Sequence, residues 1–561
     1  MKLMLHPVVT AAGASFLCYL VLIAPLVDPH HGWIYHDSGT AAGIILPLLF
    51  NIAAIWILFT LLLLLARRPG RVRVGVWSGL ILFTAPVLLK EMAALLGWQF
   101  PHRLSMVLLL ASSVCWIATV SLWRPSCAAL FERVQHFSVR MFAVAALLGF
   151  IGLGQLMWCF WSARAMQLPR ALHSASSSSS SSSLSEAELE AHRQRPRVIW
   201  IILDELSYEQ VYGHRFATLD LPAFDQLAAQ STVFTHAVPA ANHTEEAVPS
   251  MMTGVPVDRI RVGGDGTLRS LHDPVTGQWQ AFQSRDTIFG DALGAGFSTA
   301  VAGWYNPYCR ILPGVLDHCQ WFCREDLGEG MHSDGSILSN MAAPWADILN
   351  RIRSLRFDNS GIATRAAEGH IADYRDLSSA GDRFLEDPSI GFLLLHIPVP
   401  HPGGIYDRHT RTFATQRSSY IDNLALADAY LAHVRELLEQ RGEWDSSAIV
   451  VMGDHSWRTE MIWMRTAYWT AEDQAASHGG HFDDRPAYIV KLPHQSEAAR
   501  VDAPFAATRT RALFDGILDG SIRSAAELSA FAEQAPTRRG QAATAQFATL
   551  GGGGELRSRG R

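Results

Sequence analysis

The feature that most constrains this 561-residue chain is a series of long apolar stretches, all before about residue 165. A helix that crosses a bilayer needs about 20 mostly apolar residues. We expect residues 1–165 to form a five-helix transmembrane domain, with the first stretch retained rather than cleaved as a signal peptide, because four more spans follow it. The stretches are Pro7–Val27, Ala41–Ala66, Val74–Leu96, Leu104–Trp123 and Met141–Trp161.

Arginines between these stretches set the expected orientation, because positive charge collects on the cytoplasmic side. Residues 67–73 hold four arginines and residues 124–140 hold three, whereas residues 28–40 hold no lysine or arginine. This alternation places the N-terminus inside and everything after Trp161 outside. The expected location is the bacterial inner (cytoplasmic) membrane, with a multi-pass anchor and an extracytoplasmic remainder.

Composition excludes two classes of protein. A mean hydropathy of +0.11 with 17% charged residues argues against a disordered chain. A net charge of −6 argues against a nucleic-acid partner, since a chain that neutralises phosphates is normally basic. Residues 166–196 contain an unbroken serine run from Ser176 to Ser183, followed by a short helical pattern, and we interpret them as a linker.

Short apolar runs rich in β-branched residues alternate with helical patterns from residue 197 to 497. The clearest helical pattern is Ser418–Gln440. This alternation predicts an α/β domain with a mostly parallel central sheet. We expect residues 498–561 to be a C-terminal tail with weak helices at Pro504–Leu518 and Ala525–Gln534 and a low-complexity end. The expected strands are Val198–Leu203, Thr299–Gly303, Ile390–Leu395, Ala448–Met452 and Ala487–Lys491.

Carboxylates and imidazoles stand next to these strands. In open α/β sheets the ligand site lies beyond the carboxyl ends of the strands. Imidazole and carboxylate together suit zinc or manganese, with calcium or magnesium as alternatives. The sequence therefore predicts a site for a divalent metal. The residues concerned are Asp204, Glu205, His396, His401, Asp454, His455, His478 and His481.

A polar turn that ends at Thr244 leads into a further helical pattern. The free N–H groups and the dipole of a helix N-terminus favour an anion there. A metal-coordinated hydroxyl at that place is activated as a nucleophile toward phosphorus or sulfur. The alternative interpretation of Thr244 is a simple helix N-cap.

The order of these groups resembles the alkaline phosphatase superfamily, and its sulfatase-like branch fits best. Thr244 stands where sulfatases carry the cysteine of Cys-x-Pro-Ser-Arg-x-x-x-Leu-Thr-Gly, and Met252-Thr253-Gly254 matches the end of that motif at the same spacing. A threonine at this position resembles the lipoteichoic acid synthases and the lipid A phosphoethanolamine transferases. Those proteins also join five membrane helices through a linker to an extracytoplasmic catalytic domain.

The resemblance implies a role for each matching residue. Thr244 resembles the nucleophile and a metal ligand. Asp204, Asp454 and His455 resemble the other ligands of one ion, Glu205 is a further candidate, and His481 is a candidate for a second ion. The candidates for substrate binding are His401, Trp457, Arg458 and His478, although packing explains Trp457 and Arg458 equally well, and we interpret His396 as a structural residue.

The function that follows is a membrane-anchored, metal-dependent phosphotransferase. It would move a phosphoethanolamine- or phosphoglycerol-type headgroup from a membrane lipid to a cell-envelope glycan or lipid through a phospho-threonine intermediate. The alternative is a membrane-bound, sulfatase-like hydrolase (a phosphodiesterase, phosphatase or sulfatase) with water as acceptor. A non-catalytic membrane receptor is the rival from another class. We expect a monomer with no nucleic-acid partner.

Three cysteines cluster in the outer domain, at Cys309, Cys319 and Cys323. An oxidising compartment would pair two of the three. We expect Cys309 in the pair, with either Cys319 or Cys323 as its partner. A three-cysteine metal site is the less favoured alternative.

Overall fold

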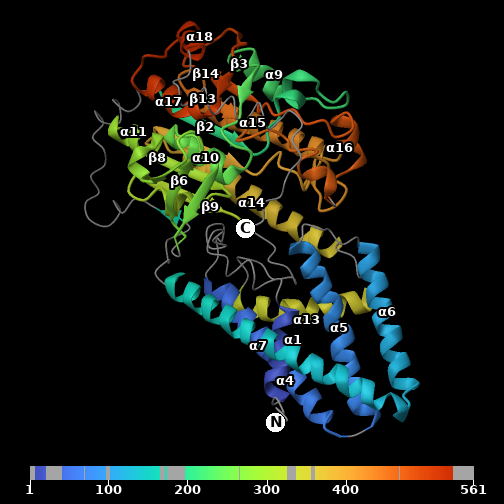
Figure 1. Ribbon diagram of the computed structural model, residues 1–561. Coiled ribbons are helices and arrows are strands. Elements are labelled where there is room, and N and C mark those ends of the chain that lie inside the picture. Colours follow the sequence, from blue (N-terminus) through green and yellow to red (C-terminus); the bar gives the residue numbers. More distant parts are fainter. Residues whose placement is uncertain are drawn as a thin grey trace.

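The computed structural model describes residues 7–19, 41–68, 70–95, 102–163, 171–172, 196–263, 266–324, 336–354, 360–466 and 468–534. Figure 1 shows a group of helices from the first third of the chain at one end and an α/β domain at the other. The expected serine linker, the end of the first apolar stretch and the low-complexity end of the tail lie outside the described residues. The helices of the first third are α1 (Pro7–Cys18), α4 (Ala41–Leu65), α5 (Arg71–Leu95), α6 (His102–Ser121) and α7 (Ala128–Ala163).

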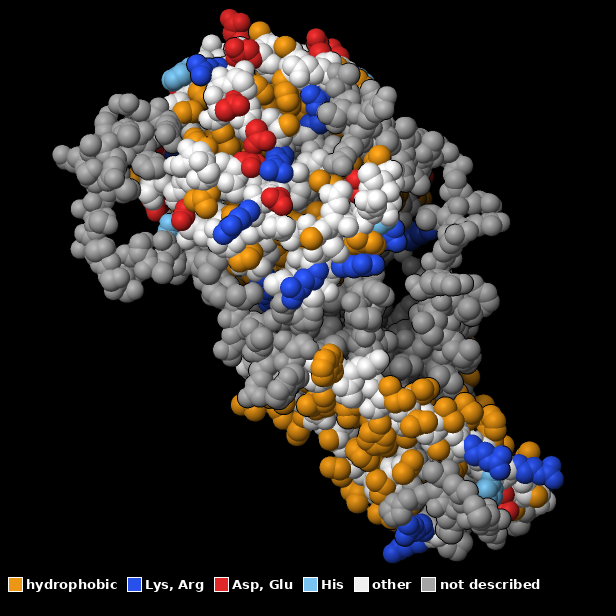
Figure 2. Space-filling view, turned by 60° about the vertical axis from the view of Figure 1, so that its left-hand side comes forward, with side chains coloured by type: hydrophobic (Ala, Val, Ile, Leu, Met, Phe, Trp, Pro, Cys, Tyr) orange, Lys and Arg blue, Asp and Glu red, His pale blue; other side chains and the backbone are white. Residues whose placement is uncertain are grey.

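Two helices in the described part of the chain are long and apolar enough to cross a membrane: Ile45–Leu65 and Ala128–Trp158. Pro7–Cys18 and Leu110–Ser121 are shorter apolar helices. The five expected spans are therefore supported only for the second and the fifth. Figure 2 shows hydrophobic side chains gathered over this helical part, at the bottom of the view, and charged side chains scattered over the α/β part.

One boundary within this helical part was predicted wrongly. We expected a loop at residues 124–140 and a span from Met141, but α7 runs without interruption for 36 residues from Ala128. Arg133 and Arg140 lie within it. Arginine is a good helix former, so a helix can continue through a segment that carries arginines beyond its apolar part. Hydropathy marks only the apolar part of such a helix.

The described residues of the α/β part form a nine-stranded sheet in the order β1-β9-β8-β10-β2-β13-β14-β3-β15. The sheet is mostly parallel, as predicted, and the antiparallel pairs are those of β14 with β13 and β3 and of β1 with β9. The strands are β1 (Ala171–Leu172), β2 (Val198–Leu203), β3 (Thr232–Phe234), β8 (Thr299–Trp304), β9 (His318–Phe322), β10 (Phe392–Ile397), β13 (Ala448–Met452), β14 (Tyr488–Lys491) and β15 (Ala499–Val501).

Strand β2 is the centre of the sheet and is buried along its whole length. Its residues alternate between two hydrophobic cores, because successive side chains point to opposite faces. Trp200 packs with the core that includes Met251 and Phe514, and Ile201 packs with the core that includes Leu424. A sheet covered on both faces explains why its strands are continuous apolar runs.

Helices cover both faces of the sheet, and the described residues form three smaller sheets outside it. The predicted helix Ser418–Gln440 is α15, which begins at Tyr420 behind a capping box between Ser419 and Asp422. The helices are α9 (Pro222–Ala228), α10 (Thr244–Thr253), α11 (Ile288–Gly294), α12 (Tyr308–Ile311), α13 (Ile337–Ser354), α14 (Ser360–Glu386), α15 (Tyr420–Gln440), α16 (Ala471–Ala476), α17 (Thr510–Leu518) and α18 (Ala525–Glu533). The strands of the small sheets are β4 (Ala237–Val238), β5 (Arg259–Val262), β6 (Leu268–Asp273), β7 (Gln278–Ala281), β11 (Tyr406–Asp407), β12 (Thr412–Phe413) and β16 (Phe505–Ala506).

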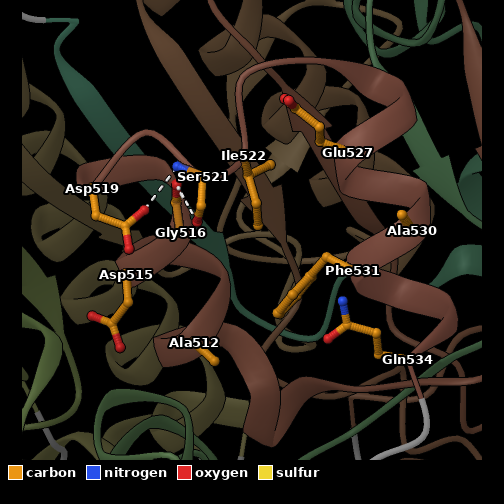
Figure 3. Close-up of a pocket in the computed structure, with 10 residues that line it drawn as sticks. All are labelled: Ala512, Asp515, Gly516, Asp519, Ser521, Ile522, Glu527, Ala530, Phe531 and Gln534. Carbon is orange, nitrogen blue, oxygen red and sulfur yellow. Dashed lines mark hydrogen bonds between the residues drawn. The ribbon is translucent and has the colours of Figure 1, made fainter.

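Residues 499–534 belong to the domain, not to a tail as we expected. Strand β15 pairs in parallel with β3, and Phe505 and Phe514 are fully buried. Figure 3 shows a pocket lined by residues of α17 and α18, Asp515 and Phe531 among them. Its volume is about 440 Å³. The sequence missed this because short edge strands give little periodicity.

Candidate active site and metal centre

Four neighbouring parallel strands, in the order β8-β10-β2-β13, bring their carboxyl ends to one edge of the sheet. Asp204 follows β2, Asp454 and His455 follow β13, and His396 lies near the end of β10. Parallel pairing therefore collects residues separated by 250 positions in the sequence at one place. This edge is where open α/β sheets bind ligands.

Thr244 meets this edge as the first residue of α10. Its hydroxyl donates to Asp454 Oδ2 at 2.7 Å and lies 3.3 Å from Asp204 Oδ2 and 3.4 Å from His455 Nε2. All four side chains are buried. The structure thus brings together the predicted nucleophile and the three predicted ligands, with the hydroxyl at the amino end of a helix, where an anion is favoured.

Two backbone features hold the carboxylates in place. Glu205 has a left-handed φ of 62°, and its N–H donates to Asp454 Oδ1 at 3.0 Å. A Cβ on Gly453 would lie 2.7 Å from the Leu206 carbonyl oxygen, so only glycine allows β13 to end this close to β2. Strained backbone of this kind concentrates at functional sites.

The site carries an excess of buried negative charge. We therefore ask whether a divalent metal ion fits among its side chains. Asp204, Glu205 and Asp454 are all fully buried beside one cation, Arg458. Burial, then Asp454 and Glu205, raise the pKa of Asp204 well above its usual value. Asp204 Oδ1 is buried without a hydrogen-bond partner among the described residues. An unsatisfied carboxylate oxygen next to like charges suits a divalent cation.

The available ligand atoms agree with that interpretation. Single ligand atoms of Asp204, Asp454 and His455 lie within 4.8 Å of one another, as do those of Asp204, Glu205 and His401. Burial lowers the pKa of His455 well below its usual value, so its ring is neutral and free to ligate. The first group is the predicted one, and its carboxylate–imidazole chemistry fits a divalent metal.

His396, which the sequence suggested was structural, connects Asp204 to the core. Its Nε2 donates to Asp204 Oδ2 at 3.2 Å, and its Nδ1 accepts from the Tyr308 hydroxyl at 2.7 Å. Burial lowers its pKa to about 4, so the ring is neutral. Gly303 leaves the space, because a Cβ there would lie 2.2 Å from the Tyr308 ring. His396 therefore orients one oxygen of Asp204.

The carboxylate of Glu205 is hydrogen-bonded to Arg458, which leaves it less available to a metal ion than the carboxylate of Asp204. Arg458 donates through its backbone N–H, Nε and Nη2, and Trp463 donates through Nε1 at 2.9 Å. Arg458 Nη1 also donates to the Asn242 carbonyl oxygen at 3.1 Å. The guanidinium thus compensates one carboxylate charge and braces the turn before Thr244, whereas Glu205 is a weaker candidate ligand than Asp204.

His401 also approaches Glu205, with its Nε2 3.9 Å from Glu205 Oε1. Its ring contacts Trp304, His370 and Trp463, and burial lowers its pKa well below the usual value. This placement leaves His401 next to the predicted centre. His370, from α14, had no signal in the sequence, because nothing in a helical pattern shows which residue faces a distant loop.

Asn306 is a further residue that the sequence analysis missed. It is fully buried, and its Nδ2 donates to the Thr244 carbonyl oxygen at 3.2 Å. Its position in the sequence could have revealed it, since Asn306 follows the predicted strand Thr299–Gly303 at the same edge of the sheet as the other site residues.

Three expected residues lie apart from this cluster. His478 and His481 line a separate cavity of about 20 Å³ together with Glu209 and Asp483. The described residues that could hold a metal together do not include either histidine. Trp457 is buried and stacks on Tyr420, with ring centroids 4.1 Å apart. The structure therefore gives Trp457 a packing position and leaves His478 and His481 outside the metal cluster.

The cysteine expectation is confirmed in one of its two forms. Cys309 and Cys319 form a disulfide that joins α12 to β9. It lies next to Tyr308 and thus supports the residue that holds His396.

Fold and site together define an α/β protein of the alkaline phosphatase superfamily. The profile of the type I phosphodiesterase / nucleotide pyrophosphatase family matches residues 198–512, more than half of the chain. The chain belongs to this family.

Solved structures with similar folds include two enzymes. The phosphonate monoester hydrolase of Agrobacterium radiobacter is 14% identical, with 58% of this chain and 74% of that chain covered at a TM-score of 0.34. The murine ectonucleotide pyrophosphatase / phosphodiesterase 5 is 10% identical, with 58% and 95% covered at a TM-score of 0.32. A comparison with curated proteins finds no match.

Proposed function

We propose that this protein is a membrane-anchored, metal-dependent phosphotransferase that takes a phospho-headgroup from a membrane lipid through a phospho-threonine intermediate. The observation that carries the proposal is the Thr244 hydroxyl, buried 2.7 Å from Asp454 Oδ2 at the amino end of a helix. A buried hydroxyl beside two carboxylates and an imidazole is well placed to attack a bound phosphodiester.

In the first half-reaction, Thr244 Oγ1 forms a bond to phosphorus as the bond from phosphorus to the lipid oxygen breaks. The Thr244 proton passes toward Asp454, which already accepts it in a hydrogen bond. The leaving lipid alcohol departs with the electron pair of the broken bond and takes up a proton. In the second half-reaction, the oxygen of an acceptor hydroxyl forms a bond to phosphorus as the bond from phosphorus to Thr244 Oγ1 breaks, and the proton of the acceptor passes to Thr244 Oγ1.

Asp204, Asp454 and His455 would hold the cation, with zinc or manganese the best match to the ligands. A bound divalent cation supplies positive charge that stabilises the Thr244 alkoxide and the phosphoryl oxygens. His396 keeps Asp204 oriented and Arg458 balances Glu205. The free N–H groups at the start of α10, beside Thr244, would stabilise negative charge on the transferred group.

The molecule that accepts the phosphoryl group from Thr244 distinguishes a transferase from a hydrolase. We infer a cell-envelope glycan or lipid as acceptor from the membrane anchor, whereas family membership favours a hydrolase with water as acceptor. Incubation of the purified protein with a phospholipid labelled in its headgroup distinguishes them. Release of free headgroup without an added acceptor supports the hydrolase, and turnover that requires an added glycan or lipid supports the transferase.

The first prediction concerns Thr244 itself. Thr244→Ala removes the attacking oxygen but no carboxylate or imidazole, so we expect turnover to be lost while the metal content stays close to that of the wild type. Thr244→Ser should retain part of the activity. Turnover of a soluble phosphodiester and elemental analysis of the bound metal provide the measurement.

Thr287→Ala is the matched control, because Thr287 is a buried threonine at the start of α11, with its hydroxyl bonded to the Ser284 carbonyl oxygen. We expect this variant to keep its activity. Normal turnover by Thr244→Ala would contradict the mechanism.

A further inference from the structure

Helix α13 belongs by sequence to the outer domain, between β9 and α14, yet it packs against the membrane helix α4. Asn340 Nδ2 donates to the Gly43 carbonyl oxygen at 2.9 Å, and Trp345 Nε1 donates to Asn51 Oδ1 at 2.7 Å. Figure 1 shows α13 among the helices of the first third. The outer domain therefore sends one helix back into the helical part.

These contacts lie along the apolar part of α4. Gly43 and Asn51 are eight residues apart, which is about 12 Å along a helix. The candidate span begins at Ile45, so Asn51 lies inside it. A buried amide within an apolar span needs an internal partner, and Trp345 supplies one.

The side of α13 that carries Leu338 and Leu349, away from Asn340, presents an exposed apolar stripe, and Trp345 lies at its border with α4. Leu338, Trp345 and Leu349 are exposed, with Leu338 at 77% and Leu349 at 48%. Their spacing of seven and four residues places them on one face of the helix, and exposed Ala342 and Ala346 fill the gaps. Residues 337–346 hold no charged side chain.

The occupant of this stripe follows from its surroundings. On α4, the residues flanking the contact with α13 include Leu46 and Phe50, which are also exposed and apolar. Two exposed apolar surfaces on docked helices, one of them a candidate membrane span, form a continuous face for lipid. A tryptophan whose indole N–H is bonded inward suits the region near the membrane interface.

We propose that α13 lies in the extracytoplasmic leaflet and contacts acyl chains through Leu338, Trp345 and Leu349. This inference rests on the proposed membrane anchor. Helix α14 begins six residues after α13 ends, and its His370 packs against His401 at the candidate site. The α13–α14 segment thus sets the position of one wall of the site relative to the lipid headgroups.

The test places single cysteines in the full-length protein, with its cysteines other than Cys309 and Cys319 replaced by serine. Leu338→Cys and Leu349→Cys report on α13. Leu61→Cys is the membrane reference, since Leu61 is exposed on α4, and Ser379→Cys is the aqueous reference, exposed on α14. Each single-cysteine variant is labelled with an environment-sensitive fluorophore. The labelled protein is then reconstituted in phosphatidylcholine nanodiscs with normal or brominated acyl chains.

We expect blue-shifted emission and quenching by brominated lipid at positions 338 and 349, as at position 61, with no quenching at 379. Quenching at 61 but not at 338 and 349 would overturn this inference and leave the membrane anchor intact. Blue-shifted emission without quenching at 338 and 349 would also overturn it, because protein would then cover the stripe. Absence of quenching at 61 would overturn both the inference and the anchor.

A second variant separates positioning from catalysis. Leu338→Glu with Leu349→Glu keeps the residues of the site, so turnover of a soluble phosphodiester should stay unchanged. Turnover of a phospholipid in vesicles should fall several-fold. Equal turnover of the lipid by both proteins would contradict the positioning role of α13.

Discussion

Asp428 shows how a single buried carboxylate outside the site affects the protein. Its Oδ1 accepts two backbone N–H groups at the start of α9, from Ala223 and Phe224, each at 3.0 Å. Burial raises its pKa from 3.8 to about 6. The folded protein therefore holds this proton more tightly than the unfolded chain does, and stability falls as the pH rises through this range.

The Asp428→Asn variant keeps the acceptor oxygen but cannot ionise. We expect its free energy of unfolding to increase relative to wild type between pH 3.8 and about 6, by at most about 3 kcal/mol. Chemical unfolding followed by tryptophan fluorescence at several pH values measures the difference. A difference that does not change with pH would contradict this account of Asp428.

At the same scale, the sequence revealed residues that follow strands and missed those that reach the site from elsewhere. Asp204, Asp454 and His455 could be predicted because parallel strands share one ligand-binding edge. His370 and Tyr308 could not, since they lie on helices whose contacts depend on tertiary packing. His481 lines a separate cavity, since nearness to a strand in sequence does not fix the direction of the loop, and its role at a second ion stays a prediction.

At the scale of elements, the Cys309–Cys319 disulfide joins α12 to β9 across ten residues. Closing a loop of this size stabilises a protein by roughly 2–3 kcal/mol. We expect the double variant Cys309→Ser with Cys319→Ser to have a free energy of unfolding lower by about that amount. Adding a reductant should not change the free energy of unfolding of this variant. Cys323→Ser, in the same segment, is the control and should keep the sensitivity of the wild type to reductant.

Core strands were predictable as elements, and edges and insertions were not. Strands β2 and β13 have the predicted bounds because both faces of the sheet are covered and their apolar runs are continuous. The edge strand β15 is three residues long, and α7 extends through a segment that carries two arginines. The bounds of such elements depend on tertiary contacts with neighbouring elements more than on their own residues.

At the scale of the whole molecule, the proposed function places the α/β domain and residues 67–73 on opposite sides of the membrane. The positive-inside rule supports this orientation. We expect a membrane-impermeant thiol reagent to label Ser379→Cys in spheroplasts of the cysteine-replaced protein. Gly70→Cys, in the arginine-rich connection, should be labelled only after the membrane is permeabilised. The reverse pattern would contradict the proposed orientation.

The covalent state of Thr244 during turnover tests the central claim most directly. The protein is mixed with a phospholipid of known headgroup, quenched in acid, digested and analysed by mass spectrometry. The account predicts that the peptide containing Thr244 gains the mass of the phospho-headgroup, and that this adduct is absent from Thr244→Ala. Continued turnover with no adduct on Thr244, or with the adduct on another residue, would contradict it.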